Sequence, residues 1–109
     1  GKHKVRAAKA DIAMTALKAQ EAQEKIALQV TQSHLVLNES QKKLSLSQRN
    51  LSKAEENLRM ARVGFDEGVI TTSDLLAAQT AWMAAKTDVV DAQIDLRLAQ
   101  SALRKAIAD

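Results

Sequence analysis

Few residues in this 109-residue chain could do chemistry. There is no cysteine, and the two histidines, His3 and His34, stand far apart without a carboxylate at metal-ligand spacing that differs from the surrounding charge. A zinc site needs several such ligands to converge, and an enzyme needs a nucleophile, a base and an orienting group together. The sequence gathers neither set, so we expect no metal, no cofactor and no enzymatic activity.

The one interruption of the chain lies at Gly64 and Gly68. Apart from Gly1 these are the only glycines, and there is no proline. Gly68 is suited to close a turn with a positive φ. The rest of the chain is rich in Ala, Leu, Lys, Glu and Gln, a composition that favours long helices packed side by side. The glycines therefore predict a turn between two helices.

The residues that follow Gly68 predict the start of a second helix and a contact surface. Thr71 can cap that helix, with Asp74 three residues further on as its reciprocal partner. Val69 and Ile70 lie between the glycine and the cap, where both would be exposed at the tip of a hairpin. Exposed apolar residues at such a tip indicate a surface that another molecule contacts.

Large residues recur every seven positions on both sides of the turn. After it they are Leu75, Trp82, Val89, Leu96 and Leu103; before it they are Val30, Leu37, Leu44, Leu51, Leu58 and Phe65. A small residue fills a second position of each repeat, from Ser33 to Ala61 and from Ala78 to Ala106. A two-position repeat of seven is typical of a coiled coil. We predict an all-α fold, a long antiparallel coiled-coil helical hairpin with Trp82 in its core.

The first helix should be longer than the second. We expect residues 1–109 to form a single hairpin, with helices over about 3–64 and 72–108 and a tip over 65–71.

The second helix can then cover only about residues 30–65. Residues 1–29 would extend beyond it by about 43 Å at 1.5 Å per residue. Val5, Ile12 and Ile26 continue the spacing of seven there, but the step from Ile26 to Val30 is four, which is a stutter. In isolation this segment would either dimerise or fray.

The segments before and after the turn carry opposite net charges. Residues 1–65 carry twelve Lys and Arg against six Asp and Glu, whereas residues 66–109 carry four against seven. This favours pairing of the arms, although exposed ion pairs contribute at most about 1 kcal/mol each. Basic and acidic residues are interspersed and aromatic residues are scarce, so we do not expect nucleic-acid binding. No apolar run approaches the roughly 20 residues that span a bilayer, so this segment should not cross a membrane.

A second apolar row lies one position beyond the heptad stripe. Leu76, Met83 and Val90 are also seven apart. A two-helix hairpin on its own would leave this row in water, so the row predicts packing against further hairpins.

The stretch from Gly68 to Trp82, preceded by Phe65, resembles the periplasmic tip of the TolC family of outer-membrane efflux proteins. The family pattern is an aromatic residue, a glycine, two residues, Ser or Thr, two residues, Asp-Leu-Leu and then Ala-Gln. This chain matches it with Phe65, Gly68, Thr71, Asp74-Leu75-Leu76 and Ala78-Gln79. The uninterrupted helix expected before the tip fits the family as well.

The resemblance implies a trimeric parent protein in the outer membrane of a Gram-negative bacterium. Each protomer would send two helical hairpins through the periplasm, and this chain would be one of them. The tip would dock a periplasmic adaptor (membrane fusion) protein and, through it, an inner-membrane pump. The docking residues implied are Gly68, Val69, Ile70, Thr71 and Thr72.

Asp74 would lie at the pore entrance, where a ring of carboxylates selects cations. The family often has a second acid where Ala77 stands, and some relatives have an arginine where Ile70 stands. The acidic ring implied here is therefore thinner, and any docking by Ile70 would be through apolar contact.

Two alternatives remain for this hairpin. It could belong to the adaptor protein itself, whose arms also run in heptads, or it could be a purely structural coiled coil. The stretch from Asp74 to Gln79 fits the efflux duct better, and the apolar tip argues against a purely structural role.

Overall fold

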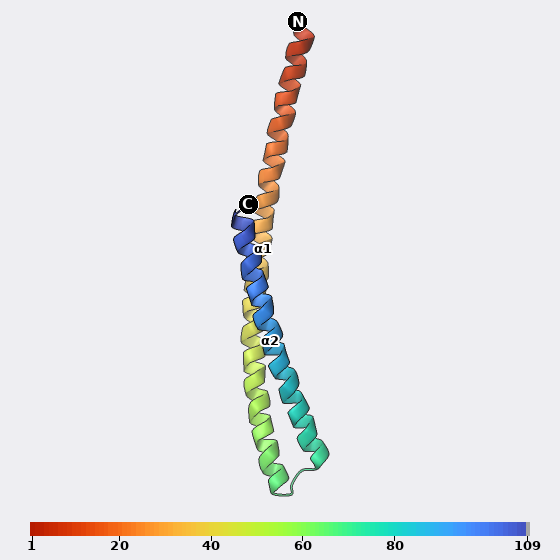
Figure 1. Ribbon diagram of the computed structural model, residues 1–109, viewed down its shortest axis with the longest axis vertical. Coiled ribbons are helices and arrows are strands. Elements are labelled where there is room, and N and C mark those ends of the chain that lie inside the picture. Colours follow the sequence, from red (N-terminus) through yellow and green to blue (C-terminus); the bar gives the residue numbers. More distant parts are fainter. Residues whose placement is uncertain (109) are drawn as a thin grey trace.

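The computed structural model describes residues 1–108 and consists of two antiparallel α-helices (Figure 1). Helix α1 spans Lys2–Asp66 and helix α2 spans Thr72–Ala108. The predicted hairpin with a longer first helix is confirmed. Helix α1 ends two residues later than expected, so only residues 67–71 connect the helices.

The molecule is a rod whose length is set by α1. The 65 residues of α1, at a rise of about 1.5 Å each, account for the longest dimension of 99 Å, whereas the other two are 19 and 13 Å. Two helices side by side cannot enclose a core, so one seam between α1 and α2 holds the hairpin together.

The seam follows the predicted heptads. Its most buried residues are Leu58, Val89, Ala92, Ala99, Ser40 and Ser47. Nearly all the other heptad positions, from Val30 to Ala61 and from Leu75 to Ala106, are half-buried. The hydroxyl of Ser47 donates a hydrogen bond of 2.8 Å to the carbonyl of Leu44, so this buried polar group is satisfied within its own helix. Small residues thus account for four of the six most buried positions of the seam.

The two aromatic residues behave differently. Trp82 is half-buried in the seam, and the Nζ atom of Lys86 lies 4.8 Å from the centroid of its ring, within the range of a cation–π interaction. Phe65, which the heptad placed in the core, is 39% exposed, so that assignment was wrong. It lies in the last turn of α1, where the two helices diverge toward the tip (Figure 1).

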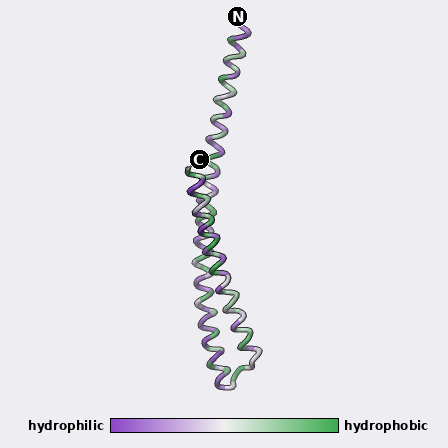
Figure 2. The backbone as a smooth tube through the Cα atoms, viewed as in Figure 1, coloured by the Kyte–Doolittle hydropathy of each residue, from purple (hydrophilic) through white to green (hydrophobic). Residues whose placement is uncertain are grey.

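The N-terminal part of α1 has no partner in the hairpin. Residues 1–29 are all exposed, and half-burial begins at Val30, as predicted from the unequal helix lengths. Figure 1 shows this segment extending past the end of α2, and Figure 2 shows hydrophobic and hydrophilic residues alternating along it. Its exposed residues include Val5, Ile12 and Leu17, so the segment offers apolar surface to another molecule.

One ion pair joins the two helices within residues 1–108. The Nζ atom of Lys43 on α1 lies 2.7 Å from Oδ2 of Asp95 on α2. The hydrogen bond to Asp95 and the charge of Asp95 raise the pKa of Lys43, and the charges of Asp91 and Asp88 act in the same direction. Because the pair is exposed, it contributes little to stability, but it marks which residues of the two helices lie at the same level.

Replacing Leu58 with alanine tests the seam. Leu58 is 5% exposed, and truncating a buried leucine lowers the free energy of unfolding by about 2–5 kcal/mol. Leu35→Ala is the matched control, because Leu35 is exposed on the same helix and its loss should change stability by no more than about 0.5 kcal/mol. Urea unfolding followed by circular dichroism measures both. Equal effects of the two substitutions would mean that the heptad stripe is not the core.

Candidate docking tip and outer groove

Helix α1 ends in a glycine-closed turn. The N–H of Val69 donates to the carbonyl of Gly64 at 2.8 Å, and the N–H of Gly68 donates to the carbonyl of Phe65 at 3.0 Å. This pair of bonds is the Schellman motif, which requires a left-handed residue just after the helix. Gly68 supplies it with a φ of 73°, as predicted. The turn therefore satisfies the last carbonyls of α1 and has a defined conformation.

Helix α2 begins with the predicted capping box. The N–H of Asp74 donates to Oγ1 of Thr71 at 3.1 Å, and the N–H of Thr71 donates to Oδ2 of Asp74 at 3.1 Å. These reciprocal bonds satisfy two amide groups at the start of the helix, and the carboxylate suits the positive end of the helix dipole. Asp74 is exposed, so its charge faces solvent while it caps the helix.

The two apolar residues of the tip have different environments. Val69 is 75% exposed, the highest fraction among the large apolar residues within residues 1–108, whereas Ile70 is half-buried. A methyl group placed on Gly64 would lie 3.4 Å from Cγ2 of Ile70, so the isoleucine packs over the bare backbone of that glycine. The expectation that both residues would be exposed was therefore wrong for Ile70. The exposed apolar group of the tip is Val69, flanked by the exposed Thr71 and Thr72.

The described residues hold no cluster of metal-binding side chains. Among residues 1–108, no three His, Asp or Glu side chains converge in a way that could hold a metal ion. His34 is exposed on α1. Neither helix combines the length and the apolarity that crossing a membrane requires.

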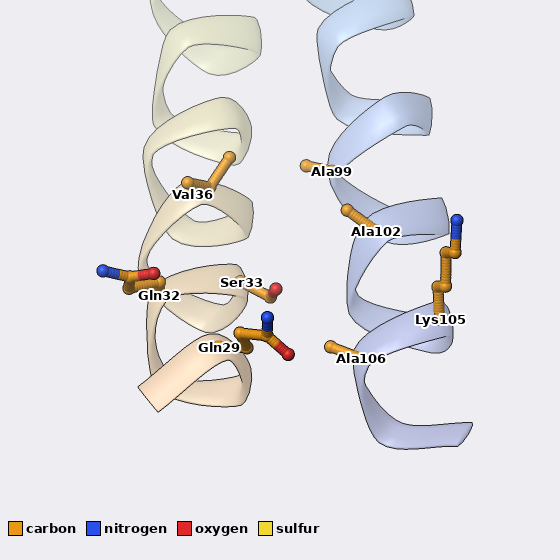
Figure 3. Close-up of a pocket in the computed structure, with 8 residues that line it drawn as sticks. All are labelled: Gln29, Gln32, Ser33, Val36, Ala99, Ala102, Lys105 and Ala106. Atoms are coloured by element: carbon orange, nitrogen blue, oxygen red, sulfur yellow. The ribbon is translucent and has the colours of Figure 1, made fainter. Parts of the chain in front are cut away.

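A shallow groove, hereafter the outer groove, runs along one side of the seam. At the end near residue 106, Ser33 and Gln29 of α1 point toward Ala106 of α2 (Figure 3). The outer groove continues toward the tip along residues of both helices. These residues are Val36, Ser40, Lys43, Leu46 and Ser47 of α1 and Ala102, Ala99, Leu98, Asp95, Asp91 and Asp88 of α2.

The outer groove combines apolar residues with an acidic row. Val36, Leu46 and Leu98 are exposed along it. Asp88, Asp91 and Asp95 lie on its α2 side, and Lys43 pairs with Asp95 alone. Within residues 1–108, Asp88 and Asp91 have no ion-pair partner. The heptad pattern did not predict this surface, because a period of seven marks the residues inside the seam and not those that border it.

Comparison with known proteins places the chain in a family. The family model described as "Outer membrane efflux protein" matches residues 1–109. Neither the curated proteins nor the solved structures contain a match to the chain.

Alanine substitutions at the two glycines of the turn should have opposite effects. A β-carbon at a left-handed position costs about 1–2 kcal/mol, so Gly68→Ala should lower the free energy of unfolding by that amount. Gly64 has helical geometry, and a β-carbon there meets Ile70 at an ordinary 3.4 Å. Gly64→Ala should therefore raise stability by about 0.5–1 kcal/mol through helix propensity. Thermal unfolding measures both, and a neutral Gly68→Ala would contradict the turn.

The capping box can be tested with two neighbouring threonines. Thr71→Ala removes the hydroxyl that accepts from Asp74 and should lower the free energy of unfolding by about 0.5–2 kcal/mol. Thr72→Ala is the control, because Thr72 is an exposed helical residue and should change stability by less than about 0.5 kcal/mol. If both variants unfold at the same urea concentration, the cap contributes nothing.

Proposed function

The chain belongs to the outer membrane efflux protein family, and on this basis we propose that it is a periplasmic hairpin of a trimeric efflux duct. In this proposal the tip docks the adaptor protein of a tripartite export pump, whose inner-membrane component supplies the substrate. The family match favours this role over the two alternatives, the hairpin of the adaptor itself and a purely structural coiled coil.

The observation that carries the docking proposal is the position of Val69. An apolar side chain that is 75% exposed is unfavourable in water, and burying it against a partner would contribute about 1 kcal/mol or more. Val69 stands on a turn whose conformation is held by the bonds to Gly64 and Phe65. A contact residue on a preformed turn loses little conformational entropy when it binds.

Ile70 anchors the docking turn to the end of α1. Its side chain packs on Gly64, and its N–H lies 3.3 Å from the carbonyl of the same residue. In this proposal Ile70 holds the turn against the end of α1, while Gly68, Val69, Thr71 and Thr72 form the surface that meets the adaptor. The two threonines add polar groups at the rim of the apolar contact, an arrangement common in protein interfaces.

Asp74 would place a charge at the entrance of the duct. Its carboxylate is exposed and is oriented by its bond to the N–H of Thr71. Three copies related by trimer symmetry would form a ring of carboxylates that attracts cations and opposes closure by mutual repulsion. The residue would then combine a structural role in capping α2 with an electrostatic role at the pore.

The exposed row on α2 supports assembly with other hairpins. Leu76, Met83 and Val90 are each about half exposed, a larger continuous apolar strip than a lone rod in water would keep. Neighbouring hairpins of a helical barrel would cover this row.

The docking proposal is tested by the affinity of the chain for the adaptor of its own export system, measured by surface plasmon resonance. Val69→Asp should weaken binding at least about tenfold, because a carboxylate would be buried in an apolar contact. The free energy of unfolding should not change, since Val69 is exposed in the hairpin.

Two further variants complete this experiment. Ile70→Asp should weaken docking and also lower stability, because Ile70 packs on Gly64. Val5→Asp is the matched control, because Val5 is exposed at the opposite end of the rod, and it should bind the adaptor as the unsubstituted chain does. Unchanged binding by Val69→Asp would reject the tip as the docking site.

A further inference from the structure

The tip carries two acidic groups that its own fold does not use. Residues 63–85 contain Asp66, Glu67 and Asp74 and no Lys, Arg or His, which gives this part of the chain a net charge of −3, whereas the whole chain carries +3. The carboxylate of Asp74 caps α2. Asp66 and Glu67 are exposed, and within residues 1–108 neither takes part in an ion pair. Folding of the hairpin therefore does not account for these two acids.

Both acids stand at the end of a helix that disfavours their charge. Asp66 is the last residue of α1, Glu67 is its C-cap, and the last turn holds no basic residue. The C-terminal end of a helix carries a partial negative charge, which disfavours carboxylates and favours Lys or Arg. Arg62, one turn earlier, forms no ion pair with Asp66 in the part of the chain that the structure describes. The two acids therefore lower the stability of the hairpin, whereas Asp74 raises it.

A partner that covers Val69 also meets these two carboxylates. Glu67 is two residues from Val69 and Asp66 is three, so their Cα atoms lie within about 7 and about 11 Å of the Cα atom of Val69. A stable interface covers about 800 Å² of each partner, which corresponds to a patch about 16 Å in radius. Both acids therefore fall inside the contact or on its rim.

The chemistry of the partner follows from this neighbourhood of apolar and acidic groups. A wholly apolar partner would remove water from the carboxylates and offer nothing in its place, which costs free energy. A Lys or Arg of the partner would replace the lost water with a charge-assisted hydrogen bond. The same cation would also offset the repulsion between the carboxylates and the negative end of α1.

We propose that the adaptor surface docked by this tip is an apolar site with a basic rim, in which Lys or Arg side chains pair with Asp66 and Glu67 while Val69 fills the apolar centre. This inference rests on the proposed function, because it specifies the chemistry of the adaptor that the tip meets. The two acids serve recognition and not folding. They lower the stability of the free hairpin, and they raise the affinity and the rate of association of the complex.

Neutralising the two acids separates recognition from folding. In the neutral-tip variant, Asp66→Asn with Glu67→Gln, the size and helix propensity of both side chains are nearly unchanged. The midpoint of urea unfolding should rise, because the repulsion at the end of α1 is removed. The affinity for the adaptor of the same export system, measured by surface plasmon resonance at low salt, should fall about three- to tenfold. If stability fell together with affinity, the acids would be part of the fold and the proposal would be overturned.

The salt dependence of binding gives an independent readout. Raising the ionic strength from about 0.1 to about 1 M shortens the screening length from about 10 to about 3 Å. The affinity of the unsubstituted chain for the adaptor should therefore fall with added salt, whereas that of the neutral-tip variant should respond less, so that the two affinities converge. The same salt dependence in both chains would contradict ion pairing by Asp66 and Glu67.

A distal control removes the same two charges far from the tip. Asp11→Asn with Glu21→Gln alters exposed residues of α1 that lie about 67 Å or more from residue 66 at 1.5 Å per residue, many screening lengths away. This variant should bind the adaptor as the unsubstituted chain does. Equal weakening by the distal control and the neutral-tip variant would mean that the net charge of the chain, and not the tip, attracts the adaptor, and would overturn the proposal.

Val69→Asn distinguishes this inference from the function on which it rests, because it removes the apolar contact without adding a charge. The proposal predicts that Val69→Asn and the neutral-tip variant both bind more weakly. If Val69→Asn binds more weakly but the neutral-tip variant does not, the tip docks through apolar contact alone and only the basic rim is rejected. If Val69→Asn binds unchanged, the tip is not the docking site, and the proposed function fails together with this inference.

Discussion

The whole structure depends on one seam in which large and small side chains alternate. Ala92 and Ala99 on α2 and Ser40 and Ser47 on α1 are among the most buried residues, and they let the helix axes approach while the large residues close the sides. A rod of 99 by 19 by 13 Å has no second layer to compensate for a gap. The seam ends at the tip on one side and at the last residues of α2 on the other, which leaves residues 1–29 of α1 uncovered. The outer groove runs along its border.

Much of this architecture can be predicted from the sequence, because a period of seven specifies which residues face the partner helix. Gly68 and the capping pair of Thr71 and Asp74 were also predictable, since each has a local cause. The environments of Ile70 and Phe65 were not. Ile70 is half-buried because the turn brings its side chain back against Gly64, and Phe65 is exposed because the helices diverge toward the tip. Neither relation exists until the turn has folded.

Local hydrogen bonds fix the conformation of the tip on both sides. Backbone hydrogen bonds close the C-terminus of α1, and the capping box closes the N-terminus of α2. Val69 is exposed on the short connection between them. The chain belongs to the outer membrane efflux protein family, and a valine, with few rotamers to lose, suits the contact proposed for this surface.

The central claim is that α1 and α2 pack antiparallel in one register, and a pair of introduced cysteines tests it most directly. Ser40 and Ala99 are both buried in the seam and border the same part of the outer groove. The variant with Ser40→Cys and Ala99→Cys should form an intramolecular disulfide under mild oxidation and remain helical. The variant with Ser40→Cys and Ala92→Cys, shifted by one heptad on the same face, should not. A disulfide in the shifted pair, or none in the first, would contradict the account.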